Sequence, residues 1–366
     1  MRTLTLERIL GRGAMGTTYA ATIAEADGST SSCAVKVMKG AGGDRQGLRE
    51  RLAAQGQVLA AASVSGVLGV EEVLEVEGWD AVATSLIEGI DLGAIVSGGA
   101  LPAKACAEVG AALAGHLAKL HAVQPEPLAH QDLKPSNVVI TAAGDVWLLD
   151  FGVARAAYAE REDKTQGLVL GTLNYFPPEI LSGGTPDRRV DVYGLGVLLL
   201  ELSSGQAWGP PLMHRERFMR RVDQRLAALP DERAPLADVL GGLLCWERGE
   251  RRTAAVAAHD FAAAAESLPG PGLVDWAATA IEPMMTMRSV LRRDDLVGRT
   301  FDLKGERGPE QDQRSDRSEG LTSDRSNLRR VLPVLAVCAV LLVLGLAGVT
   351  VLGAGVLALG WYVFGL

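Results

Sequence analysis

The sequence predicts an α+β fold in which a small β-rich lobe, residues 1 to about 88, precedes a larger helical lobe, residues 89 to about 268. Short runs with β-branched residues, separated by glycine-containing turns, fill the first part of the chain. After about residue 100, apolar residues recur at helical spacing in "AKACAEVGAALAGHLAKLHAV" and "RVDVYGLGVLLLELSSG". A chain of 366 residues is long enough for a large core of this kind.

The first predicted elements are three strands: "TLTLERIL", "TTYAATIAE" and, after a turn at Asp27-Gly28, "SCAVKVMKG". The alternation of polar and apolar residues at the N-terminus predicts a strand and not a secretory signal. Between the first two strands, "GRGAMG" places Gly11, Gly13 and Gly16 in a GxGxxG pattern. A dinucleotide-binding turn requires a helix next, whereas a strand follows here, so we predict a glycine hairpin that admits phosphate oxygens to backbone N–H groups.

Five further polar residues have the chemistry that phosphoryl transfer requires. Lys36 occupies the polar position of an otherwise apolar strand, where its ammonium can neutralise nucleotide phosphates. In "HQDLKPSNVVI", Asp132 is a candidate base for the attacking hydroxyl and Lys134 a source of positive charge. Asn137 and Asp150, the latter in "DVWLLDFG", supply oxygen ligands suited to Mg²⁺.

These motifs occur in the order "GRGAMG", "AVK", "HQDLKPSN", "DFG", "GTLNYFPPE", "DVYGLG" and "ERGERR". In that order the chain resembles the eukaryotic-type serine/threonine protein kinases found in bacteria, over residues 1 to about 268. The resemblance implies the bilobal protein-kinase fold, ATP and Mg²⁺ as cofactors, and proteins with Ser/Thr acceptors as substrates.

The resemblance also assigns individual roles. The glycine hairpin, including Arg12, and Lys36 would bind the phosphates of ATP, Asp132 would be the catalytic base, and Asn137 and Asp150 would bind Mg²⁺. Lys134 and Thr172 match residues typical of kinases that act on Ser or Thr. Adenine would contact the backbone near Ser85 to Ile87. Glu179 and Arg251 resemble the ion pair that fastens the activation segment to the helical lobe.

Two departures from the family's pattern bear on activity. Gln55, or Gln57 in a shifted register, stands where the family has the glutamate that pairs with the lysine, so we expect a weaker anchor for Lys36. Gln131 precedes the catalytic aspartate where most relatives have an arginine that receives a phosphorylated residue. We therefore predict that phosphorylation at Thr165 is not strictly required for activity.

The rest of the chain predicts a linker and an anchor. Residues 269–330 are expected to be a disordered juxtamembrane linker, because "PGPG" breaks the chain and "KGERGPEQDQRSDRSEGLTSDRSNLRR" has few large apolar groups. Its more apolar part, 284–303, is either a short docking helix or further linker. Residues 331–366 contain no charged side chain and predict a transmembrane segment, as one tilted helix or a tight hairpin.

The charge pattern sets the expected location. Arg329 and Arg330 precede the apolar segment, which predicts a single-pass protein of the cell (inner) membrane with its globular part in the cytoplasm. The small-residue pair Ala354 and Ala358 is compatible with a homodimer. A net charge of −8, with no basic stripe, argues against nucleic-acid binding. The four cysteines fit neither a zinc site nor a disulfide framework, so we expect buried free thiols.

Two alternatives to an active protein kinase remain. A nucleotide-binding pseudokinase or scaffold is suggested by Gln55. A small-molecule phosphotransferase would share the catalytic loop, but "GTLNYFPPE" resembles the segment that shapes a peptide-binding ledge.

Overall fold

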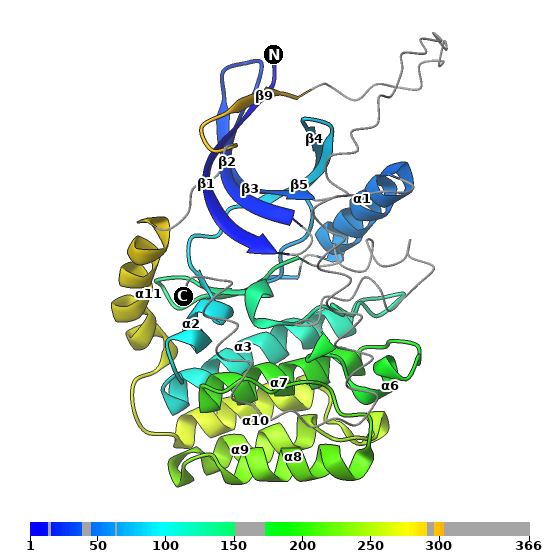
Figure 1. Ribbon diagram of the computed structural model, residues 1–366, viewed down its shortest axis with the longest axis vertical. Helices are drawn as coiled ribbons and strands as arrows, with labels where there is room; N and C mark the ends of the chain where they lie inside the picture. Colours follow the sequence, from blue (N-terminus) through cyan, green and yellow to red (C-terminus); the bar gives the residue numbers. More distant parts are fainter. Residues whose placement is uncertain (14–15, 39–44, 63, 151–172, 291–295, 304–366) are drawn as a thin grey trace, which may run out of the picture. The chain divides into compact units, whose positions relative to one another are not determined.

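The computed structural model describes residues 1–13, 16–38, 45–62, 64–150, 173–290 and 296–303. In this part of the chain a small lobe built on a β-sheet precedes a larger helical lobe (Figure 1). The predicted bilobal arrangement is therefore confirmed. Residues 1–306 form one compact unit.

The small lobe is an antiparallel sheet of six strands in the order β4-β5-β3-β2-β1-β9. The strands are β1 (Thr3–Gly13), β2 (Gly16–Ala24), β3 (Thr30–Met38), β4 (Glu72–Val76), β5 (Trp79–Ser85) and β9 (Thr300–Asp302). Alternate residues of β1, such as Leu4 and Leu6, are fully buried, as the polar–apolar alternation predicts. The turn between β2 and β3 contains Gly28 with φ 89°, a conformation that glycine adopts without strain.

Helix α1 (Arg45–Ala62) packs against this sheet through a small apolar cluster. Leu48 and Leu52 from the helix are 4% and 0% exposed and share the cluster with Val70 and Val82. Gly56 lies where an added Cβ would be 2.1 Å from the Val70 carbonyl oxygen. The absence of a side chain at Gly56 therefore allows α1 to approach the backbone before β4 closely.

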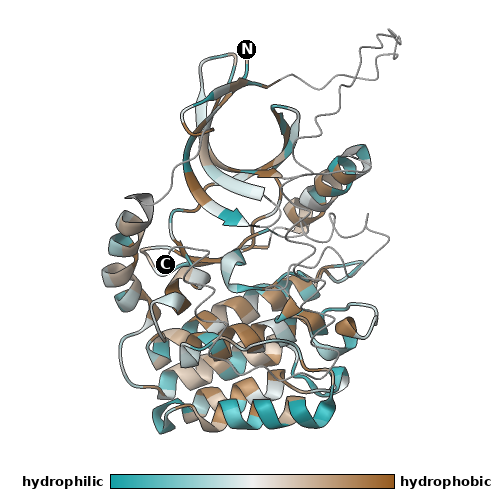
Figure 2. Ribbon diagram, viewed as in Figure 1, coloured by the Kyte–Doolittle hydropathy of each residue, from teal (hydrophilic) through white to brown (hydrophobic). Residues whose placement is uncertain are grey.

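The larger lobe is a packed set of helices around one apolar core. Its helices are α2 (Leu92–Ser97), α3 (Ala103–His121), α6 (Pro178–Leu181), α7 (Arg189–Ser204), α8 (Arg215–Ala227), α9 (Ala234–Leu243) and α10 (Ala254–Ser267). Every residue of α7 from Val190 to Ser203 is buried, so this helix runs through the centre of the lobe. Figure 2 shows α7 mostly apolar and α8, at the periphery, mostly hydrophilic.

A second sheet of three short strands lies at the start of the helical lobe. Its strands are β6 (Ile90–Asp91), β7 (Val138–Ile140) and β8 (Val146–Leu148). A single 3-10 turn, η1 (Pro135–Asn137), leads into β7. The Leu148 N–H donates to the Gly66 carbonyl at 2.8 Å, which ties this ribbon to the segment after α1. The sheet therefore gives the predicted site loops a rigid base close to the small lobe.

The predicted linker is wrong over its first part. Helix α11 (Leu273–Val290) and strand β9 occupy part of the stretch 269–330 that we predicted to be a disordered linker. Spaced apolar residues in α11 pack on the helical core, and that burial offsets the entropy of ordering them. Residues 304–330 lie outside the described chain, as does the predicted transmembrane segment 331–366. No helix among the residues that the structure describes is long and apolar enough to span a bilayer.

Candidate active site

The glycine motif forms the tip of the β1–β2 hairpin, where Gly13 pairs with Gly16. Gly16 has φ 153°, and a Cβ added there would lie 2.1 Å from the Val37 carbonyl oxygen, so the close approach of β3 requires glycine. A Cβ added at Gly11 would meet no atom within 4 Å. Arg12 is exposed beside it. The hairpin thus presents backbone with open space next to it, which suits the approach of phosphate oxygens.

Lys36 of β3 contacts Asp150, which follows strand β8 of the second sheet. Its Nζ donates to Asp150 Oδ2 at 2.5 Å, and the lysine side chain is 13% exposed. Burial by itself raises the pKa of the Asp150 carboxyl, but the charge and hydrogen bond of Lys36 outweigh burial, so this pKa is lowered. Asp150 is consequently an anion at neutral pH, as a ligand for a cation must be. Asp150 also has φ 60°, an uncommon conformation for this residue type.

The partner expected for Lys36 in α1 is not established. Gln55 belongs to α1, but its side chain lies outside the described part of the structure. Besides its apolar contacts, α1 is joined to the sheet by Arg49, which donates to Asp80 Oδ1 at 2.6 Å and to Glu75 Oε2 at 2.8 Å. The Asp80 side chain is only 1% exposed. The consequence of Gln55 for activity therefore stays a prediction.

Three of the predicted residues meet in the loop between α3 and β7. Asp132 Oδ2 accepts from Lys134 Nζ at 2.6 Å and from Asn137 Nδ2 at 2.9 Å. Asn137 Nδ2 also donates to the Asp132 carbonyl at 2.8 Å. Asp132 and Asn137 are each 3% exposed. The amide group thereby fixes the rotamer of the carboxylate, and its own oxygen, Oδ1, accepts from Ser136 Oγ at 3.5 Å.

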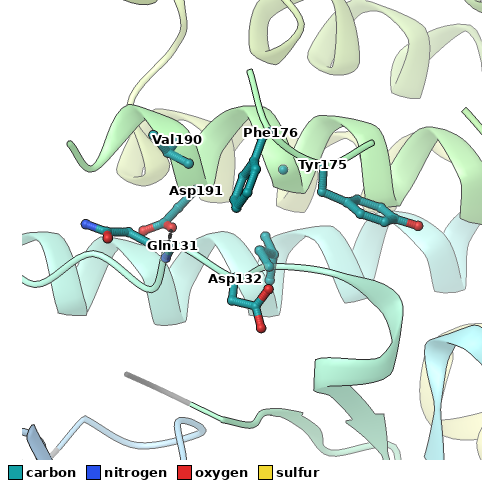
Figure 3. A pocket seen from close by; sticks show the side chains of 8 residues that line it. Gln131, Asp132, Tyr175, Phe176, Val190 and Asp191 are labelled. Atoms are coloured by element: carbon teal, nitrogen blue, oxygen red, sulfur yellow. Dashed lines mark hydrogen bonds between the residues drawn. The ribbon is translucent and has the colours of Figure 1, made fainter. Parts of the chain in front are cut away.

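Asp191, which was not among the predicted site residues, holds the loop in a strained conformation. Gln131 has φ 62°, and Asp191 of α7 accepts from its N–H at 2.7 Å and from the His130 N–H at 2.8 Å. Figure 3 shows the Asp191 side chain reaching Gln131, while the Asp132 carboxylate points away from α7. His121 Nε2 lies 2.9 Å from Asp191 Oδ2 and completes this buried cluster. A buried acid thus keeps Asp132 aimed outward.

A signal for Asp191 is present in the sequence. "DVYGLG" has an acid within the first turn of a helix whose following two turns are mostly apolar. A fully buried acid needs partners, so its position inside such a helix predicts a structural role. The sequence alone does not say which backbone groups it binds.

Two hydrogen bonds also join this loop to Leu149, which lies between β8 and Asp150. His130 Nε2 lies 2.9 Å from the Leu149 carbonyl oxygen, and the Leu149 N–H donates to the Asn137 carbonyl at 2.7 Å. Asn137 and Asp150 are therefore held by one hydrogen-bonded unit. Their positions relative to Asp132 do not depend on long, flexible side chains.

Glu179 and Arg251 form the predicted ion pair. Arg251 donates to both oxygens of Glu179, at 2.6 and 2.8 Å, and its own side chain is 0% exposed. The pair joins α6 to the loop before α10. Thr165 and Thr172, the other residues predicted in or near this segment, lie outside the described residues.

The segment predicted to contact adenine, Ser85 to Ile87, begins at the last residue of β5. Ser85 pairs with Cys33 of β3, and Ile87 is half-buried in the link to β6. Arg8 of β1 donates to both carboxylate oxygens of Glu88, at 2.6 and 2.7 Å, so the link also contacts the strand that carries the glycine hairpin.

The donor set fits Mg²⁺ with a nucleotide better than a metal held by protein alone. Asp132 Oδ1 is buried and has no hydrogen-bond partner among the described residues, which leaves it available to a hydroxyl group. Asn137 and Asp150 provide hard oxygen ligands. No cluster of three or more His, Cys, Asp or Glu suited to a metal occurs in the described ranges. Mg²⁺ commonly takes one or two protein oxygens and completes its shell with phosphates and water.

The comparisons with known proteins agree with this geometry. A sequence model of the protein kinase domain matches residues 4–261. Serine/threonine-protein kinase PknD of Mycobacterium tuberculosis is 31% identical over 202 residues, which are 55% of this chain and 29% of PknD. The lectin-domain containing receptor kinase VI.3 of Arabidopsis thaliana is 30% identical over 269 residues, which are 67% of this chain and 37% of that protein.

A solved structure gives the same fold. The crystal structure of the M. tuberculosis PknI kinase domain has a TM-score of 0.53 and 24% identity, covering 72% of this chain and 96% of the PknI domain. The chain therefore belongs to the protein kinase family. It spans about a third of the length of the curated relatives described above.

Proposed function

We propose that the chain is an active protein kinase that transfers the terminal phosphoryl group of ATP to Ser or Thr hydroxyls of proteins. The observation that carries this proposal is the meeting of Asp132, Lys134 and Asn137 in one hydrogen-bonded loop beside the Lys36–Asp150 pair. These groups supply a proton acceptor, oxygen ligands and positive charge at one site, which phosphoryl transfer needs.

The proposed roles follow from the contacts. The acceptor hydroxyl binds to Asp132 Oδ1, which gives up no existing hydrogen bond among the described residues to receive it. Lys134 and Asn137 hold the other carboxylate oxygen, so Asp132 keeps one orientation while it takes the hydroxyl proton. Bound Mg²⁺ would neutralise phosphate charge, with Asn137 and Asp150 as its protein ligands. Lys36 would bind the nucleotide phosphates while it stays next to Asp150, to which its ammonium group donates.

The test compares matched aspartate variants of the full chain. Asp132→Asn removes the proton acceptor and is expected to lower phosphate transfer from labelled ATP by about 10²- to 10⁴-fold. Asp145→Asn is the control, because Asp145 is exposed in the β7–β8 turn and has no proposed role. Label should appear on Ser or Thr and not on Tyr. Equal transfer by Asp132→Asn and wild type would disprove the assigned chemistry.

A second candidate is a nucleotide-binding protein without phosphoryl transfer. It is favoured by Gln55, because this position carries no charge where the family has a glutamate. The same experiment separates the two: a pseudokinase binds labelled nucleotide but gives no signal above that of Asp132→Asn.

We also propose that residues 331–366 anchor the kinase in the cell membrane with its catalytic part on the cytoplasmic side. The support is a run of apolar residues longer than the about 20 that cross a bilayer, preceded by two arginines. Deletion of 331–366 should move the protein from the membrane fraction to the soluble fraction. Recovery of the deletion variant with membranes would contradict the anchor.

A further inference from the structure

The C-terminal part of the described chain contacts both lobes. Helix α11 lies against the helical lobe, beside α3 and β6, and β9 lies at the edge of the small-lobe sheet (Figure 1). Neither contact is part of the active site described above.

The helical contact is an apolar stripe. Leu273, Ala277 and Ile281 recur every four residues along α11 and are 5%, 0% and 0% exposed. They belong to the core of the helical lobe. The N-terminal end of the helix is fastened as well, because Glu108 of α3 accepts from the Leu273 N–H. Helix α11 is therefore a fixed part of this lobe.

The contact with the small lobe is a strand addition. Residues 296–303 pair with β1 over Thr3–Thr5 and extend the pairing on both sides. The Leu6 N–H donates to the Arg299 carbonyl at 3.1 Å, the Gly298 N–H donates to the Leu6 carbonyl at 2.7 Å, and the Leu303 N–H donates to the Arg2 carbonyl at 2.9 Å. Backbone groups at the β1 edge that would otherwise face solvent thus find partners.

Side chains reinforce the backbone pairing. Leu296, Val297, Phe301 and Leu303 pack on the small-lobe core, of which Leu4 and Leu6 are part. Arg299 forms an ion pair with Glu77 of the β4–β5 turn and lies with its guanidinium carbon 5.2 Å from the centre of the Phe301 ring. The segment 296–303 is accordingly anchored by apolar burial and charge together.

These two anchors act on the same stretch of chain. Strand β1 runs from its pairing with β9 directly to the glycine hairpin, so a restraint on β1 is a restraint on the cover of the phosphate site. Between Val290 and Leu296 the chain has few residues, and each adds at most about 3.6 Å. While both ends stay docked, the lobes can separate only as far as that length permits.

We propose that residues 296–303 form an interlobe strap that restrains β1 against the helical lobe and thereby slows the release of nucleotide from the cleft. The proposal rests on the nucleotide site of the proposed function. It adds a regulatory element, because any event that peels β9 from β1 would open the cleft without touching a residue of the active site.

The first arm of the test removes the apolar anchor in the full chain. Phe301→Asp puts a charge among apolar side chains, whereas Asp302→Asn, on the exposed side of the same strand, is the matched control. The readouts are the dissociation rate of N-methylanthraniloyl-labelled ADP with Mg²⁺ and the hydrogen exchange of the Leu6 amide. Phe301→Asp should accelerate release about threefold or more, in line with a shift toward an open population, and expose the Leu6 amide. Asp302→Asn should change neither.

The second arm restores the strap within one polypeptide. Thr5 and Thr300 are paired across β1 and β9 with their Oγ atoms 2.9 Å apart, a geometry suited to a disulfide between cysteines. In Thr5→Cys/Thr300→Cys/Phe301→Asp, release should be fast when reduced and slow again when oxidised. Because the reduced and oxidised forms are the same polypeptide, a difference between them does not come from a variant that fails to fold.

The outcomes distinguish the proposals. Equal release rates for the oxidised and reduced forms overturn the strap, even when phosphate transfer is present. Strap-dependent release in a chain without phosphate transfer supports the strap and overturns only the proposed activity. A wild-type chain that binds no labelled ADP overturns both.

Discussion

Arg251→Met tests how strongly the ion pair with Glu179 holds the segment after the activation region. The guanidinium of Arg251 is fully buried and donates to both oxygens of Glu179. It also donates to three backbone carbonyls, those of Cys245 at 3.0 Å and of Trp246 and Arg189 at 3.3 Å. Methionine has a comparable shape without hydrogen bonds, so the substitution removes the charge and leaves these acceptors without a partner.

The loss in the free energy of unfolding is set by the Glu179 carboxylate, which is left without its partner. Removal of one member of a buried ion pair costs about 3–5 kcal/mol, since the remaining charge keeps its desolvation penalty. The Glu179 side chain is 22% exposed, and water can reach it once Arg251 is gone. We therefore expect the free energy of unfolding to fall by about 3 kcal/mol, at the lower end of that range. Arg251→Lys, which retains charge but cannot bind both oxygens at once, should lose less.

The neighbouring arginine provides the control. Arg252 pairs with Asp260 and Asp238, but its side chain is 28% exposed and the Asp238 side chain 79%. For such solvated pairs the loss in Arg252→Met is expected to be about 0–1 kcal/mol. Urea unfolding of the wild-type chain and of the three variants, followed by tryptophan fluorescence, measures these losses. If the losses in Arg251→Met and Arg252→Met are the same, the burial argument fails.

The remaining predictions concern the catalytic loop, its control and the thiols. Asp191→Asn should lower the turnover rate strongly and destabilise the fold by about 1–3 kcal/mol or more, because a carboxylate oxygen that accepts from a backbone N–H is replaced by a donor; kinetics and urea unfolding measure both. Gln55→Glu should raise the turnover rate by restoring a charged partner for the nucleotide lysine. Thr165→Ala should retain most of the activity. Burial raises the pKa of Cys33 and of Cys106 to about 11, so at pH 8 iodoacetamide should label these thiols only after denaturation.

Each of these expectations has a contrary result. Full activity in Asp191→Asn would show that the loop keeps its conformation without the Asp191 carboxylate. An unchanged rate in Gln55→Glu would make the departure from the family irrelevant, and near-complete loss of activity in Thr165→Ala would make phosphorylation there essential. Rapid labelling of native Cys106 would contradict its burial, and the labelling rate at pH 8 and pH 10 distinguishes a protected thiol from a thiolate of ordinary pKa.

The sequence by itself determined the order of elements and the local chemistry. Alternation in β1 and β2 and the glycines between them specify a hairpin, because strand period and turn conformation are local properties. The Asp132, Lys134 and Asn137 contacts were equally predictable, because residues two and five apart in one tight loop are close in any compact form. Of the thiols expected to be buried and free, Cys33 and Cys106 are both, Cys245 is free but only half-buried, and Cys338 lies outside the described residues.

Only the tertiary structure decided which distant groups meet. Lys36 and Asp150 are separated by 114 residues, and the support of Asp191 for the loop depends on where α7 crosses beneath it. The misjudged stretch is the strongest example: β9 has three residues, too few for a pattern, and it is stable only because β1, almost 300 residues earlier, offers an unpaired edge and an apolar surface. The sequence of such a short segment does not predict a strand, because contacts with its partner supply the free energy that orders it.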